Sequence, residues 1–233
     1  MPLYTKAHGL LGKLKQSLLP DETSYRKVLF GLCKGNYLPL NLNRDIRPFL
    51  GITEIELIHY VKAYVRPGFC CYDIGANLGY YAFSFARLAA PGLVYAFEAD
   101  PELCVRLEQT LAINGGFNGR MRIVNSFLAG ELDPQQNKTT LDHLVFTERL
   151  VPPDVIKMDI DGPEYEVLCG APRLLRECRP RMIVEVHSPE LEVNCKRLLE
   201  ESGYEVQVVR NNPWVQECRP HAELNRWLAA EPR

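Results

Sequence analysis

The sequence predicts an α/β fold with a mostly parallel, seven-stranded sheet and helices on both faces. From Cys70 onward, short apolar runs alternate with longer stretches of helical periodicity. Turns that contain glycine or proline separate many of these runs. Strands that alternate with helices in this way form parallel sheets covered by helices. The length of 233 residues suits one such domain with a modest extension.

The elements follow one another in a regular order. Pro101 marks the first residue of one helix, because proline is favoured there, and Gly115 with Gly116 marks its end. The expected strands are 69–74, 93–98, 120–124, 155–159, 181–187, 204–209 and 214–218. The expected helices among them are 78–90, 101–114 and 190–202.

Residues 1–68 lack this alternation. Leu10–Leu19 and Glu54–Val65 have helical patterns, and Leu38–Leu42 reads as an extended run. None of these segments has the composition of a separate core. We therefore expect residues 1–68 to form an N-terminal helical and extended cap on a domain made of residues 69–233.

Composition restricts the class of protein. The net charge of −2 gives no electrostatic reason to expect a nucleic-acid partner. The 8 cysteines form no Cys-x-x-Cys pair, so we expect reduced thiols and a cytoplasmic location. The longest uncharged apolar run, Leu88–Phe97, is too short for an integral membrane segment, and no signal peptide is recognisable.

The turn from Asp73 to Gly79 predicts a ligand site. Gly75 and Gly79 allow a ligand to approach the backbone closely between a strand and a helix. The dinucleotide fingerprint requires glycine where this chain has Asn77, and the carboxylate of Asp73 disfavours a phosphate. A cationic ligand such as S-adenosylmethionine fits better. The alternative is a turn that only lets the helix pack on the strand.

Acids end almost every expected parallel strand, where ligands of open α/β sheets bind. Glu98 lies 25 residues after Asp73, at the position from which an acid accepts hydrogen bonds from ribose hydroxyls. Asp100, just before Pro101, better fits a helix-capping role.

A further group of charges follows the strand expected at 155–159. Lys157, Asp159 and Asp161 would share one side if that strand continued, and Asp159 at its end is expected to face the ligand. Asp161 and Glu164 also have the spacing of a capping box. Such carboxylates can hold Mg²⁺, but we expect no metal ion here.

His187 ends the strand expected at 181–187, together with Glu185. A histidine with a near-neutral pKa could accept a proton from a substrate hydroxyl. A structural histidine bonded to a neighbouring loop is an equally good interpretation of this position.

With these positions assembled, the chain from about Gly51 to His187 resembles the FkbM family of S-adenosylmethionine-dependent methyltransferases. Two positions depart from the family pattern: Asp161 stands where Glu is usual, and Ala99 where Pro is usual. The resemblance rests on the order and spacing of five blocks, at residues 73–81, 94–101, 140–142, 156–164 and 180–187.

The resemblance implies a Rossmann-like class I methyltransferase fold and methyl transfer, commonly to a hydroxyl of a sugar or natural-product precursor. We therefore expect O-methylation of a small-molecule or glycan acceptor, with Asp159 and His187 as the candidate catalytic residues. The residues expected to bind S-adenosylmethionine are Asp73, Gly75, Ala76, Asn77, Gly79 and Glu98.

Two other functions are consistent with parts of the pattern. A non-catalytic methyltransferase fold that serves as a scaffold would not need the acids at the strand ends. A nicotinamide oxidoreductase is disfavoured by Asn77 in the glycine turn.

Overall fold

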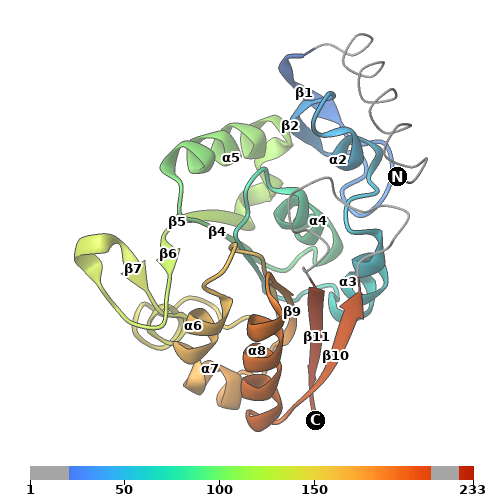
Figure 1. Ribbon diagram of the computed structural model, residues 1–233. Coiled ribbons are helices and arrows are strands. Elements are labelled where there is room, and N and C mark those ends of the chain that lie inside the picture. Colours follow the sequence, from blue (N-terminus) through green and yellow to red (C-terminus); the bar gives the residue numbers. More distant parts are fainter. Residues whose placement is uncertain (1–20, 211–225) are drawn as a thin grey trace.

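The computed structural model describes residues 21–210 and 226–233 and centres on one seven-stranded sheet (Figure 1). The strands lie in the order β10-β11-β9-β8-β3-β4-β5. All run in one direction except β11, which is antiparallel to both of its neighbours. The strands are β3 Cys71–Ile74, β4 Val94–Glu98, β5 Met121–Asn125, β8 Val155–Met158, β9 Arg181–Val186, β10 Tyr204–Arg210 and β11 Arg226–Pro232.

Helices cover both faces of this sheet, as the sequence predicts. Residues alternate along each strand, so Cys71 and Asp73 face one side while Tyr72 and Ile74 face the other. The Cys71 side packs on Phe83 and Phe85 of one helix, and the other side packs on the later helices. The helices from β3 onward are α4 Tyr80–Leu88, α5 Pro101–Ile113, α6 Glu164–Cys169, α7 Pro172–Glu177 and α8 Pro189–Glu201.

The segment before the sheet packs against the α4 side. Strands β1 (Thr23–Lys27) and β2 (Tyr37–Asn41) form an antiparallel hairpin. Leu40 of β2 and Val61 are fully buried in the same cluster as Phe83. The remaining elements of this segment are α2 Ile46–Leu50, η1 Ile55–Leu57 and α3 Ile58–Tyr64.

Short elements complete the described chain. They include the two-stranded pair β6 and β7 and the single turns around it. These elements are η2 Gly115–Gly119, β6 Phe127–Leu128, η3 Pro134–Gln136, β7 Lys138–Thr139 and the π-turn η4 His143–Thr147.

Most expected elements are confirmed within a few residues, including the extended run at 38–42 and the helical pattern at 54–65. The expectations for Leu10–Leu19 and for a strand at 214–218 lie outside the described residues. The seventh strand of the sheet is β11, which pairs between β9 and β10. Its run from Trp227 to Ala230 is buried throughout, so it lacks the alternation that marks a half-exposed strand.

The strand order places one crevice at the carboxyl ends of β3 and β8. From β3 the chain continues to β4 and β5 on one side of the sheet, and β8 and β9 then occupy the other side. Ligands of open α/β sheets bind at such a reversal of strand order. The turn after β3 therefore lies where a ligand site is expected.

Candidate functional site

The turn after β3 needs its first glycine for close packing as well as for backbone conformation. Gly75 has φ 78°, and a Cβ at this position would lie 1.8 Å from the backbone oxygen of Asp159. The turn therefore packs directly on the loop that follows β8, and any side chain at residue 75 would separate them. Gly79 precedes α4 with φ 88°, and Asn77 between the glycines also has positive φ, 47°.

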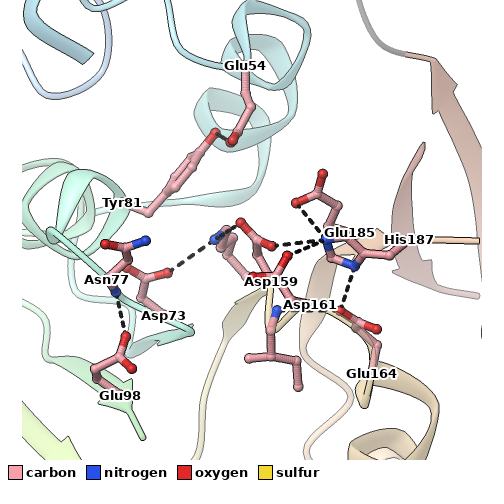
Figure 2. A network of polar contacts seen from close by, with 12 residues as sticks. Glu54, Asp73, Asn77, Tyr81, Glu98, Asp159, Asp161, Glu164, Glu185 and His187 are labelled. Carbon is pink, nitrogen blue, oxygen red and sulfur yellow. Dashed lines mark hydrogen bonds and ion pairs between the residues drawn. The ribbon is translucent and has the colours of Figure 1, made fainter. Parts of the chain in front are cut away.

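Glu98 is held by the backbone on both of its oxygens. Oε2 accepts a hydrogen bond from the Asn77 N–H at 2.8 Å, and Oε1 accepts one from the Asp100 N–H at 3.0 Å. The carboxylate is thus fixed at the carboxyl end of β4, against the glycine turn (Figure 2). Asp100 itself caps α5 through the Glu102 N–H, as expected.

Two cavities meet at this turn. The larger, of about 790 Å³, extends from the turn toward Thr53 and Glu54. The smaller, of about 260 Å³, runs along Glu98 toward the end of β5. Residues that line both cavities are Gly75, Asn77 and Asp159. A ligand that fills both cavities would pass over the turn.

Asp73 and Lys157 form the buried floor of the larger cavity. They are partners in register on adjacent strands, with Lys157 Nζ 3.9 Å from Asp73 Oδ1 and 3.3 Å from Asp159 Oδ2. Burial raises the pKa of Asp73 to about 6, against the attraction of the Lys157 charge. Neither carboxylate oxygen of Asp73 has a hydrogen-bond partner among the described residues.

His187 lies among four carboxylates (Figure 2). Its Nδ1 is 2.9 Å from Glu164 Oε1, and its Nε2 is 3.2 Å from Asp161 Oδ1. Glu185 and Asp159 lie 3.5 Å and 3.6 Å from the same Nε2. Burial alone would lower the pKa of His187, but hydrogen bonds and charges of Glu164 and Glu185 outweigh it and raise the pKa to about 10.

This pKa bears on one expectation from the sequence. His187 was expected to titrate near neutrality and to accept a proton from a substrate. A pKa of about 10 favours a protonated imidazole at neutral pH, which disfavours that role as a base. The structural interpretation, a histidine bonded to a neighbouring loop, agrees with its contact to Glu164.

Asp159 is a weak base for a related reason. Burial opposes its charge, but Lys157, a hydrogen bond with Glu185 and the charge of His187 outweigh burial and lower its pKa. Its side chain is 22% exposed and lines both cavities, so it does face the ligand space as expected.

The expected capping box at Asp161 and Glu164 is wrong in detail. Strand β8 ends at Met158, and α6 begins at Glu164 with Pro163 as its N-cap and no side-chain cap. Asp161 has φ 55° and a 78% exposed side chain. Glu164 instead accepts hydrogen bonds from the Gly162 and Ile160 N–H groups. These bonds fold the loop before α6 around the Glu164 carboxylate. Asp161 therefore does not lie on the side of the sheet that Lys157 faces, because β8 has ended before it.

Asp159, Asp161 and His187 each place one possible metal-ligand atom within 4.8 Å of the others. His187 Nε2 also lies within ion-pair distance of both carboxylates, 3.6 Å from Asp159 Oδ1 and 3.2 Å from Asp161 Oδ1. That this group holds no metal ion stays a prediction.

Sequence reasoning missed Glu54 and Tyr81. The Tyr81 hydroxyl donates a hydrogen bond to Glu54 Oε2 at 2.5 Å, and both residues line the larger cavity (Figure 2). Glu54 belongs to no motif, so only the packing of residues 21–68 on α4 could reveal it. Its φ of 44° is unusual for a residue other than glycine and is a feature of the structure alone.

Comparisons with known proteins find methyltransferases that this chain resembles. The model of the methyltransferase FkbM domain matches residues 130–219, which include the last three of the five sequence blocks. The hexuronic acid methyltransferase AglP of Haloferax volcanii is 26% identical over 188 residues, 72% of this chain and 75% of the relative.

Solved structures show the same fold. A precorrin-6y C5,15-methyltransferase from Geobacter metallireducens has a TM-score of 0.55 at 15% identity, covering 77% of this chain and 89% of that one. Methyltransferase FkbM from Methylobacillus flagellatus has a TM-score of 0.57 at 16% identity, covering 79% and 55%. The chain therefore has the Rossmann-like class I methyltransferase fold, and its residues 130–219 match the methyltransferase FkbM domain.

Proposed function

We propose that the protein transfers the methyl group of S-adenosylmethionine to a hydroxyl of a small-molecule or glycan acceptor. The observation that carries this proposal is the pairing of Glu98 with the Asn77 N–H at the junction of two cavities. A fixed carboxylate beside a glycine turn is suited to a ribose diol, because its remaining lone pairs can accept from both hydroxyls.

The two cavities suit the two ends of the donor. Glu98 would hold the ribose where they meet, and the smaller cavity beside it would hold the adenine. The backbone of Gly75, Ala76 and Asn77 lines the larger cavity with Asp73, where the methionine end would lie. Gly79 would set the turn that starts α4.

Charge in the site favours a cationic donor. Asp73, Asp159, Asp161, Glu164 and Glu185 form ion pairs with Lys157 and His187, so five carboxylates gather around these two basic groups. S-adenosylmethionine supplies an electrophilic methyl group on a positively charged sulfur. A site with excess carboxylates stabilises a positive ligand and disfavours the phosphates of a dinucleotide.

The acceptor is proposed from the same cavity and from one relative. The larger cavity continues beyond Asp159 to Thr53 and Glu54, which leaves space for a second molecule beside the donor. The relative from Haloferax volcanii is a hexuronic acid methyltransferase, which makes a sugar acid a reasonable first acceptor to test. Transfer then depends on positioning a hydroxyl in line with the donor methyl.

We also propose a cytoplasmic protein that does not act on nucleic acid. The cysteines of the described chain are free thiols, and most of them are buried. No helix in residues 21–210 or 226–233 is long and apolar enough to cross a membrane. The net charge of −2 provides little attraction for a polyanion.

A product assay separates this proposal from a scaffold function. The protein is incubated with S-adenosylmethionine and a panel of sugars and sugar acids that begins with D-glucuronic acid, and mass spectrometry follows the formation of S-adenosylhomocysteine and methylated product. Methylated product supports the proposal. Donor binding without product over the whole panel would support a non-catalytic module instead.

A further inference from the structure

Glu54 occupies a distinctive place in the larger cavity. It comes from the segment before the sheet, whereas Asp73, Gly75 and Asp159 line the cavity from the strand ends. Its backbone has φ 44°, a conformation that costs a residue with a side chain about 1–2 kcal/mol. Backbone strain of this kind often occurs at functional sites. In this protein the strained backbone of Glu54 holds its carboxylate in the cavity wall opposite the glycine turn after β3.

Tyr81 fixes the orientation of that carboxylate. Its side chain is buried, and its hydroxyl donates to Glu54 Oε2 at 2.5 Å. The ring is held from its other side by Lys157, whose Nζ lies 5.0 Å from the ring centroid. Burial raises the pKa of Tyr81 well above its usual value, so the phenol remains a donor. Tyr81 thus holds Oε2 of Glu54, and Oε1 is the carboxylate oxygen that this hydrogen bond does not use.

Position distinguishes Glu54 from the other carboxylates with a raised pKa. Asp73, with a pKa of about 6, lies beside Lys157 at the floor of the cavity. Glu185, whose pKa burial raises to about 7, contacts His187 and is not among the residues that line this cavity, and Asp159 has a lowered pKa. Burial raises the pKa of Glu54 to about 8, with Asp159 and Glu185 adding to the rise and Lys157 and the Tyr81 hydrogen bond opposing it. The other charged residues that line this cavity are Arg44, Asp45 and Arg47. A base works best when its pKa lies near the working pH.

We propose that Glu54 is a catalytic residue that takes the proton from the acceptor hydroxyl, with Tyr81 as its positioning residue. This inference rests on the methyl transfer proposed above. The acceptor O–H bond breaks and its proton goes to Glu54 Oε1. The oxygen forms a bond to the methyl carbon, and the electrons of the broken carbon–sulfur bond stay on sulfur. The products are a methyl ether, S-adenosylhomocysteine and a neutral Glu54.

Glu54→Gln tests the role with little change of shape, since an amide can still accept the hydrogen bond from Tyr81. Glu54→Asp keeps the carboxylate but moves it back, and Glu56→Gln is a control two residues away in the same segment. Each variant is first titrated with S-adenosylhomocysteine and unfolded thermally. We expect all three to match the wild type in affinity within about threefold, because Glu54 lies on the acceptor side.

Turnover with D-glucuronic acid and S-adenosylmethionine is then measured from pH 6 to 9. We expect Glu54→Gln to lower kcat by about 10²–10⁴-fold at every pH, with Glu54→Asp in between and Glu56→Gln unchanged. The wild-type kcat should rise with pH to a plateau, and this rise should vanish in Glu54→Gln. Wild-type kcat and pH profile in Glu54→Gln would overturn the inference. Failure of the wild type to bind S-adenosylhomocysteine would instead overturn the proposed function.

Discussion

The backbone N–H of Asn77 donates a hydrogen bond to Glu98 Oε2 at 2.8 Å, which joins the turn after β3 to the end of β4. This contact places the acid of the smaller cavity against Asn77, which lines both cavities, so the turn and an acid 21 residues further along the chain form one site.

Glu98→Gln should weaken binding of S-adenosylhomocysteine by about 10–100-fold, because an amide accepts weaker hydrogen bonds than a carboxylate. Calorimetric titration measures the change. Glu102→Gln is the matched control: its exposed side chain lies in the first turn of α5, and only its backbone takes part in the cap. Equal affinity in Glu98→Gln and wild type would reject the ribose assignment.

Gly75→Ala should abolish donor binding and lower the free energy of unfolding by about 2–4 kcal/mol, because its Cβ would lie 1.8 Å from the Asp159 backbone oxygen. Gly116→Ala separates the clash from the backbone strain. Gly116 has a similar φ of 66°, but a Cβ there meets nothing within 4 Å. We expect it to cost about 1–2 kcal/mol and to leave binding intact. Similar losses in both variants would show that close packing at Gly75 is unimportant.

Lys157→Met should lower the free energy of unfolding by about 3–5 kcal/mol, because it leaves buried carboxylates without their cation. Lys157 is 3% exposed and lies 3.9 Å from Asp73 Oδ1. Adding Asp73→Asn should recover part of the loss, since the amide needs no counter-charge. Urea unfolding of both single variants and the double variant measures the coupling. Strictly additive effects would contradict a direct interaction between the two side chains.

His187 should make the protein less stable as pH rises. Its folded-state pKa of about 10 exceeds the ordinary value of 6.5, so the folded protein binds the extra proton between these limits. The stabilisation is complete below pH 6.5 and is lost as pH rises through 10, with a slope of at most about 1.4 kcal/mol per pH unit. The free energy of unfolding, measured with urea across this pH window, should depend less steeply on pH in His187→Gln than in the wild type. An unchanged slope would show that His187 is not held protonated.

The parts of the site that the sequence could predict are those set by local pattern and strand order. Gly75, Gly79 and Asp73 follow a strand directly, and Glu98 ends the next one, so parallel pairing alone brings them together. The same rule places Asp159 beside the turn, because β8 pairs with β3.

The parts that escaped prediction depend on contacts between distant segments. Glu54 reaches the cavity only because residues 21–68 pack on α4, and no periodicity in the sequence encodes that contact. The charge of His187 depends on Asp161 and Glu164, in the connection from β8 and the start of α6, and on Glu185 in β9. Strand β11 was missed because it is buried on both faces, which removes the alternation of a half-exposed strand, and because it is antiparallel in an otherwise parallel sheet.

The central claim is that this fold binds the methyl donor at the Asn77–Glu98 junction. Calorimetric titration of the wild-type protein with S-adenosylhomocysteine tests it most directly. We predict one binding site per chain, with the affinity reduced in Glu98→Gln and unchanged in Glu102→Gln. A folded wild-type protein that gives no binding heat at any temperature tested, and no thermal stabilisation by the ligand, would contradict the account.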